Sequence, residues 1–247
     1  MASYDFRAPR LFLDAPLETG GRVALDRAQV NYLLNVLRLK GGDDVLVFNG
    51  RDGEWRARLA EAGRKAADLA VAERTRPQTV SPDLLYCFAP LKAARLDYMV
   101  QKAVEMGVGR LKPVFTRRTQ AARVNLERMR ANAIEAAEQC GVLSIPAVEP
   151  DEDFATALGR LEPERLVVFC DEDAPVANLV AALEQAGAAE KLAVIVGPEG
   201  GFDDAERALV LGLPRVVRLS LGPRILRADT AAVAVLALVQ AVLGDWR

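Results

Sequence analysis

Strand-like and helix-like segments alternate along the chain from residue 84 to its end. Apolar runs at 84–89, 166–170 and 192–196 have the length and the β-branched content of buried strands, and segments of helical periodicity separate them. Strands that alternate with helices form parallel sheets, because each helix carries the chain back to start the next strand. The sequence therefore predicts an α/β fold with a mostly parallel sheet and helices on both faces.

The first 75 residues have a different pattern. Short strand-like runs are separated by Gly-rich turn signals, and residues 54–59 alternate as a strand with one buried face does. One helix, with apolar residues spaced from Val30 to Leu37, interrupts these strands. A segment with two prolines and no periodicity follows, which is typical of a linker. We therefore expect a small β-barrel over 1–75, a linker over 76–83 and the α/β domain over 84–247.

The composition excludes several kinds of site. The chain has no histidine, which excludes Ser-His-Asp and Cys-His catalysis and the usual catalytic zinc sites. The three cysteines lie far apart without zinc or disulfide spacing, so we expect no metal. The first ten residues lack the apolar region of a signal peptide, and the apolar stretch 231–239 is shorter than the roughly 18 residues that span a bilayer. We expect a cytoplasmic protein that does not enter a membrane.

The net charge of −2 conceals a strong segregation of charge along the chain. Residues 84–130 hold ten Lys and Arg against three Asp and Glu, whereas residues 131–247 hold nine against nineteen. A basic block of this kind can form a face for a polyanion such as RNA. The ordinary alternative is a solvated helix face.

Two Gly-Pro loops follow apolar strands. The strand 192–196 ends in Gly-Pro-Glu-Gly-Gly (197–201), and the strand 216–219 is followed by Gly222-Pro223, which leads into the last helix. Ligands bind at the carboxyl ends of strands in open α/β sheets, where bare backbone groups are exposed. Neither loop has the Gly-Lys-Ser/Thr or G-x-G-x-x-G spacing of a phosphate site. Asp203 with Glu206 predicts a capping pair at the start of a helix.

Taken in order, these motifs resemble the SPOUT methyltransferases, and more narrowly the RsmE family. The resemblance covers nearly the whole chain, through RAPRLF (7–12), LLNVLRLKGGDDVLVFNGRDGEWRAR (33–58), KAARLDYMVQKAVEMGV (92–108), AAEQCG (136–141), GPEGGF (197–202) and LGPRILRADT (221–230). It implies a trefoil-knotted α/β domain behind a PUA-like RNA-binding barrel. The implied activity is S-adenosylmethionine-dependent methylation of uridine N3 in small-subunit (16S) ribosomal RNA.

The sequence departs from the family pattern at three places. Asn31-Tyr32 stands where the family has a His-His or similar pair, and Val142 stands where it commonly has Arg. Asp229 replaces Glu in the last motif, which keeps a carboxylate but shortens its reach. The change at Val142 removes one contact that the family would make to RNA or phosphate.

The resemblance implies roles for individual residues. The methyl donor would be held by Gly197, Gly200, Leu219, Leu221, Gly222 and Leu226, with a third loop near Cys170-Asp171-Glu172. Methylation of N3 requires loss of its proton and stabilisation of a developing uridylate. The catalytic candidates are the cations Arg224 and Arg227 and the carboxylates Asp229 and Glu199. The alternative roles are a helix N-cap for Asp229 and bonds to loop amides for Glu199.

The RNA-binding candidates come from both predicted domains. They would mostly contact phosphates, which set position rather than sequence specificity. Tyr86, Phe88 and Phe202 could also stack on a target base that has left its helix, although for the first two the sequence favours core packing. The basic candidates are Arg7, Arg10, Arg38 and Lys40 in the barrel, and Lys92, Lys102, Arg117, Arg118 and Arg123 in the basic block.

The last helix is apolar on all sides between Ala231 and Val239, which indicates either a helix through the core or a subunit interface. We expect a homodimer that forms through this helix. Three alternatives to uridine-N3 methylation stay open. They are a SPOUT enzyme acting on another base or a ribose 2′-hydroxyl, a non-catalytic RNA-binding protein with this fold, and a flavodoxin-like nucleotide-binding module.

Overall fold

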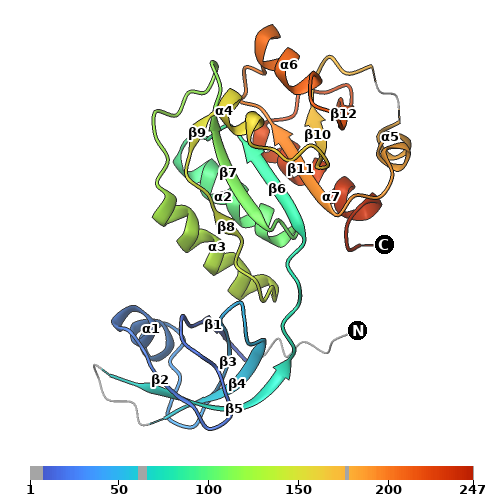
Figure 1. Cartoon of the computed structure of the whole chain (residues 1–247). Helices are drawn as coiled ribbons and strands as arrows, with labels where there is room; N and C mark the ends of the chain where they lie inside the picture. The colour runs from blue at the N-terminus through green and yellow to red at the C-terminus, as the bar shows by residue number, and fades with distance from the viewer. Residues whose placement is uncertain (1–7, 61–65, 176–177, 247) are drawn as a thin grey trace. The chain divides into compact units, whose positions relative to one another are not determined.

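The computed structural model describes residues 8–60, 66–175 and 178–246 of the chain (Figure 1). Its internal contacts divide the chain into two compact units. The first comprises Met1–Val80 with Ala137–Ser144, and the second comprises Ser81–Ala136 with Ile145–Arg247. The segment Ala137–Ser144 thus packs with the N-terminal unit, although it lies in the middle of the sequence assigned to the α/β domain.

The first unit is a five-stranded sheet in the order β1-β3-β4-β5-β2. Its pairings are antiparallel except that β1 runs parallel to β3. Alternating apolar residues of these strands, among them Val45, Val47 and Leu69, form a core of their own. The strands are β1 (Arg10–Phe12), β2 (Arg22–Ala24), β3 (Asp44–Phe48), β4 (Glu54–Leu59) and β5 (Asp68–Arg76).

The helix predicted near Val30 to Leu37 is built from two short pieces. Asp26 and Gln29 form a reciprocal capping box that starts α1 (Arg27–Asn31). The chain then widens into the π-helical turn η1 (Tyr32–Val36), in which the Leu37 amide donates to the Tyr32 carbonyl at 2.9 Å. Arg38 follows with a φ of 58°, a left-handed conformation that costs a non-glycine residue energy.

The second unit contains the predicted parallel sheet, with its central strands in the order β12-β10-β11-β6-β7. Every pairing among these strands is parallel, which confirms the prediction. Two short strands, β8 (Ala147–Val148) and β9 (Glu152–Asp153), pair with β7. The central strands are β6 (Asp83–Phe88), β7 (Arg110–Phe115), β10 (Leu166–Cys170), β11 (Lys191–Val196) and β12 (Val216–Leu219).

Helices cover both faces of this sheet, as predicted. On one face α7 packs against α2, α5 and β11, and the buried Tyr86 hydroxyl of β6 contacts the Met99 sulfur of α2 at 3.3 Å. On the other face α4 packs against α6, over a core that includes Leu85, Cys87 and Phe154. The helices are α2 (Ala93–Glu105), α3 (Leu126–Cys140), α4 (Phe154–Gly159), α5 (Leu179–Ala186), α6 (Asp204–Leu211) and α7 (Ala228–Val242).

The strand order brings three strand ends together. β10, β11 and β12 are parallel neighbours, so they end side by side at Cys170, Val196 and Leu219. Asp203 and Glu206 form the predicted capping box at the start of α6. The strand order does not define how the connecting loops thread, so the trefoil knot stays a prediction. In the described part of the chain, no helix has the length and apolar character needed to cross a membrane.

Candidate functional site

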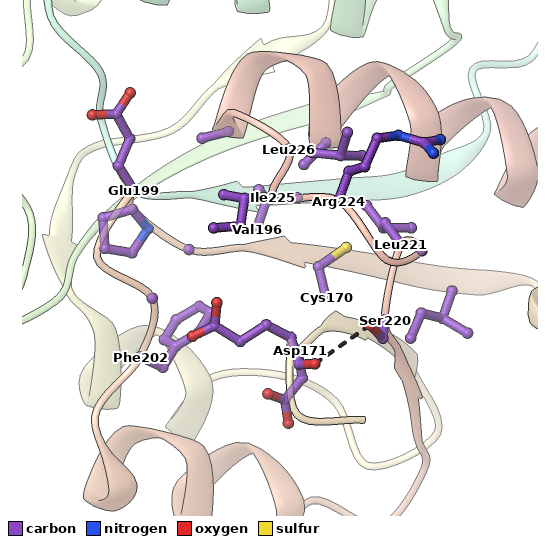
Figure 2. Close-up of a pocket in the computed structure, with 18 of the residues that line it drawn as sticks. Cys170, Asp171, Val196, Glu199, Phe202, Ser220, Leu221, Arg224, Ile225 and Leu226 are labelled. Carbon is purple, nitrogen blue, oxygen red and sulfur yellow. Dashed lines mark hydrogen bonds between the residues drawn. The ribbon is translucent and has the colours of Figure 1, made fainter. Parts of the chain in front are cut away.

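A cavity of about 440 Å³ opens where β10, β11 and β12 end (Figure 2). Three loops and the first turn of α7 form its walls, as expected for parallel strands that end together. Gly200 is absent from the lining, and its carbonyl accepts a hydrogen bond from Arg118 at 2.6 Å. The other residues predicted to hold the methyl donor line the cavity: Gly197, Leu219, Leu221, Gly222 and Leu226.

The glycines of the two loops serve different purposes. A Cβ on Gly197 would lie 2.6 Å from the Phe202 ring, so this glycine admits the ring rather than leaving room for a ligand. Phe202 is itself buried, with its ring centroid 5.0 Å from that of Phe169 and 5.2 Å from that of Phe154. Gly222 has a φ of 97° and no heavy atom within 4 Å of an added Cβ, so the backbone conformation is what requires glycine there.

Asp171 fixes the third loop, which follows β10. Its side chain is 1% exposed and accepts hydrogen bonds from Arg207 Nε at 3.1 Å and from Arg218 Nη2 at 2.6 Å. These bonds tie the loop to α6 and to β12. Asp171 and Arg207 both line the cavity, but sequence reasoning gave no role to either arginine. A buried carboxylate is stable only when it is paired in this way.

The Cys170 thiol points into the middle of the cavity (Figure 2). Burial raises the pKa of Cys170 to about 12, so its thiol stays protonated near neutral pH. A protonated thiol is a poor nucleophile. In the described residues, no three or more cysteine, aspartate or glutamate side chains come together as a metal site. The Cys170 thiol therefore contributes to the shape of the cavity rather than to its reactivity.

The two predicted carboxylates meet at one arginine that sequence reasoning missed. Arg95, in the first turn of α2, donates from Nε and Nη2 to both oxygens of Asp229 at 2.9 Å and from Nη1 to Glu199. This bond from Arg95 holds the pKa of Asp229 below its ordinary value. Arg227, not Asp229, is the N-cap residue of α7, so the N-cap alternative for Asp229 is wrong.

The two predicted catalytic arginines lie on the loop that leads into α7. Arg224 lines the cavity, but its side chain extends away from Cys170 (Figure 2). Arg227 is exposed and is not among the lining residues. The structure therefore brings Arg224 to the mouth of the cavity and leaves Arg227 at its edge.

The structure contradicts the prediction that Arg10 contacts RNA. Its side chain is 9% exposed and pairs with Glu54 at 2.9 Å. It also donates to the carbonyls of Glu138 and Val142, at the end of α3 and just beyond it, where helix carbonyls lack partners. Arg10 is thus a buried structural residue of the first unit. Arg7, another RNA candidate, lies outside the described residues.

The other basic candidates differ in how freely they face solvent. Arg118 contacts the 197–201 loop through the Gly200 carbonyl, and the Arg117 side chain pairs with Asp203, just beyond that loop, at 3.3 Å. Lys102 is half-buried, and its ammonium donates to both oxygens of Glu105. These bonds make it less available to bind a phosphate. The remaining candidates are exposed: Arg38, Lys40, Lys92 and Arg123.

The aromatic candidates of β6 belong to the core. Tyr86 and Phe88 are buried, and their rings stack on each other with centroids 5.0 Å apart. Core packing, the role that the sequence favours for these two residues, is therefore confirmed, and neither ring is available to stack on a base. Phe202 lines the cavity, but its ring is enclosed by other aromatic rings rather than displayed.

Comparison with known proteins identifies both parts of the chain. A family model described as an RNA methyltransferase domain matches residues 79–240, and one described as an RNA methyltransferase PUA domain matches residues 25–72. The ribosomal RNA small subunit methyltransferase E of Rickettsia conorii is 29% identical, with 94% of each chain covered. The protein of the same name from Synechocystis is 32% identical, with 90% of this chain and 73% of that one covered.

Solved structures agree with the sequence relatives. The crystal structure of a ribosomal RNA small subunit methyltransferase E from Neisseria gonorrhoeae, bound to S-adenosyl methionine, superposes with a TM-score of 0.84. It is 26% identical, and the match covers 98% of this chain and 100% of that one. The predicted SPOUT-type α/β fold with a PUA-like N-terminal domain is thereby confirmed. The chain belongs to the RNA methyltransferase family, and within it to the ribosomal RNA small subunit methyltransferase E group.

Proposed function

We propose that this protein methylates N3 of a specific uridine in small-subunit ribosomal RNA, with S-adenosylmethionine as the methyl donor. The observation that carries the proposal is the cavity at the ends of β10, β11 and β12 in a chain of this family. Its volume of about 440 Å³ lies within the range of small-molecule sites. The related protein from Neisseria gonorrhoeae binds S-adenosyl methionine.

The lining suits a nucleoside with a charged tail. Leu219, Leu221 and Leu226 offer apolar contact for a flat ring, and the loop backbones offer donors and acceptors for its polar edge. The donor, when bound, supplies an electrophilic methyl group on a sulfonium. The protein then has to align the acceptor nitrogen with that methyl, and positioning of this kind supplies much of the rate. The protonated Cys170 does not compete as a nucleophile.

The acceptor nitrogen of uridine carries a proton that must leave when the N–CH₃ bond forms. The released proton goes to a carboxylate or to water, and the bond from the methyl carbon to sulfur breaks at the same time. Glu199 is the carboxylate at the cavity mouth and is exposed enough to meet a substrate. Arg224, at the same mouth, is placed to stabilise the developing negative charge or to contact a phosphate.

The RNA would reach the cavity past the exposed arginines of the segment after β7. Arg117, Arg118 and Arg123 lie on this segment, where Arg118 bonds Gly200 of the 197–201 loop and Arg117 pairs with Asp203 just beyond it. Contacts from arginine to phosphate make RNA affinity fall steeply with salt. An RNA affinity that stays flat across salt concentrations would count against this path.

We also propose that the protein works as a cytoplasmic homodimer joined through α7. The outward residues of this helix, Val233, Ala237 and Leu238, are apolar and only half-buried in one chain. Ile225, just before the helix, is almost fully exposed. A second copy would cover these residues, which a soluble monomer rarely displays together. Leu238→Glu should shift the mass measured by light scattering from dimer to monomer.

The function is tested by incubating small subunits or their RNA with the protein and S-adenosylmethionine, then mapping modified nucleosides by mass spectrometry. N3-methyluridine at one position is the expected product. Another methylated base or a ribose 2′-O-methyl group would replace the proposed target with a different one. RNA binding without methylation, and without donor binding in calorimetry, would identify a non-catalytic RNA-binding protein. A bound flavin would indicate the flavodoxin-like alternative.

A further inference from the structure

Arg95 joins three elements that lie far apart in the sequence. It belongs to α2, whereas its partners Asp229 and Glu199 belong to α7 and to the 197–201 loop. That loop forms one wall of the cavity, and Ala228, beside Asp229, lines it as well. The guanidinium thus connects the rim of the donor cavity to two helices behind it.

The two sides of this connection differ in strength. Asp229 receives two parallel hydrogen bonds of 2.9 Å, and its side chain is 15% exposed. Two-pronged pairs of this kind between arginine and a carboxylate are among the strongest and most directional contacts in proteins. Glu199 is 46% exposed and is held through one of its oxygens. Asp229 is therefore the anchor, and Glu199 is the more exposed and less constrained partner.

The anchor is unsuited to accept a proton itself. Both Asp229 oxygens bond Arg95, and one of them also accepts from the Thr230 amide at 2.9 Å. The bond to Arg95 lowers the pKa of Asp229, which weakens it further as a base. The same bonds raise the pKa of Arg95, so the guanidinium stays charged at any working pH. Glu199 is left as the carboxylate that can turn toward a substrate.

We propose that Arg95 is a positioning residue for methyl transfer: anchored by Asp229, it sets the place of the Glu199 carboxylate and of the loop that carries it. The inference rests on the function proposed above and names a residue that acts through Glu199. It assigns Asp229 to the support of Arg95 rather than to proton transfer.

An ordinary structural staple between α2 and α7 is the competing explanation. These two helices already pack along their apolar sides, with Val100, Ala103, Val235 and Val239 all buried. Their packing does not depend on the Arg95–Asp229 pair alone, because burial of these apolar side chains already holds the two helices together. A staple would also leave the catalytic rate untouched while lowering the thermal midpoint.

The chain offers a matched control for the test. Arg128 of α3 makes a two-pronged pair with Asp97 of α2, at 3.0 and 2.6 Å, in the same unit but outside the cavity lining. Arg95→Met and Arg128→Met therefore remove the same kind of contact from the same helix. Arg95→Lys keeps the charge and tests whether the planar guanidinium is required.

For each variant, kcat and the KM for RNA are measured, with the Kd for S-adenosylmethionine by calorimetry and the thermal midpoint. Arg95→Met should lower kcat on the order of 10- to 100-fold, as for small misplacements of reacting groups, with smaller changes in KM and Kd. Arg95→Lys should recover part of this loss, and Arg128→Met should leave kcat unchanged. Glu199→Gln should lower kcat, and adding it to Arg95→Met should cause little further loss.

Three results would overturn the proposal. They are an unchanged kcat in Arg95→Met, an equal loss in Arg128→Met, and fully additive losses for Arg95→Met and Glu199→Gln. If Arg95→Met does not fold, Arg95→Lys takes its place. Full kcat in Arg95→Lys, together with an unchanged kcat when Glu199→Gln is added to it, would then overturn the proposal. The proposed function is tested separately, by the wild-type protein alone. A wild-type protein that binds no donor and methylates no RNA would refute that function.

Discussion

Gly197 is the residue whose replacement best tests how the proposed donor cavity is built. An alanine Cβ at this position would lie 2.6 Å from Cε2 of Phe202 and 3.0 Å from two further ring atoms. Contacts under 3.0 Å are essentially never seen for a real Cβ, so either the ring or the loop has to move. The Phe202 ring is packed between Phe154 and Phe169 and cannot turn away freely. We expect the loop to shift instead, and the cavity wall with it.

The size of the effect follows from the cost of overpacking. Inserting a methyl group into a well-packed core typically costs about 1–3 kcal/mol. If the donor must restore the original loop, this cost appears as a loss of affinity of roughly 5- to 150-fold, at about 1.4 kcal/mol for each factor of ten. If the loop keeps its place, the cost appears as a lower thermal midpoint, by about 2–4 °C for each kcal/mol in a chain of this size.

Gly200→Ala is the matched control, because it adds the same methyl group to the same loop. Its Cβ would meet the flexible Arg118 side chain at 3.3 and 3.4 Å, which can yield at little cost. Calorimetry with S-adenosylmethionine and thermal unfolding are carried out on both variants. Gly197→Ala should show either a lower affinity for S-adenosylmethionine or a lower thermal midpoint. Gly200→Ala should show neither change. Equal behaviour of the two variants would refute the argument that Phe202 dictates glycine at position 197.

Other predictions concern stability, reactivity and pH. Arg10→Met should cost about 1–3 kcal/mol in urea unfolding, because the carbonyls of Glu138 and Val142 lose a donor while Glu54 keeps its bonds from Arg76; an unchanged free energy of unfolding would contradict this. Cys170 should resist alkylation near pH 8, since burial raises its pKa to about 12, whereas the exposed Cys140 should react first in peptide mapping. The pKa of Asp97 is lowered by its bond to Arg128, so this carboxylate stabilises the fold above its unfolded pKa of about 3.9, and the stabilisation is lost as pH falls through the lower folded value. Urea midpoints measured from about pH 7 to pH 3 should therefore fall less in Arg128→Met than in the wild type.

The parallel sheet could be predicted because its information is local. Runs such as 192–196 are apolar throughout and end at Gly-Pro, so their length, burial and end point can be read from the residues alone. The π-helical turn at Tyr32–Val36 could not be predicted in this way. A π-helix and an α-helix place apolar residues on the same side over so few residues, and they differ in hydrogen-bond register, as the bond from the Leu37 amide to the Tyr32 carbonyl shows.

The cavity lining was predicted better than the charged contacts around it. Gly197 directly follows β11, Leu219 is the last residue of β12, and Gly222 lies in the loop after it, so the strand assignment places all three. Arg95 and Arg10 illustrate the limit. Each is an arginine in a basic-looking segment, and whether it meets RNA or a carboxylate depends on residues more than 40 positions away. Sequence periodicity does not contain that pairing.

The two ends of the strands in the parallel sheet serve different purposes: one end stabilises the fold, and the other end carries the cavity. At the amino-terminal ends of the strands the buried Arg165 bonds Asp83, Glu162 and the Leu192 carbonyl, which ties the start of β10 to its neighbour β11 and to β6 beyond it. Charged hydrogen bonds hold the amino-terminal ends of these strands, and apolar packing holds the core. The carboxyl-terminal ends can therefore lead into loops of glycine and proline without loss of the fold. Such loops add little stability of their own. Arg165→Met should therefore lower the stability of the second unit while leaving donor affinity in the folded fraction unchanged, the reverse of what Gly197→Ala does if its loop shifts.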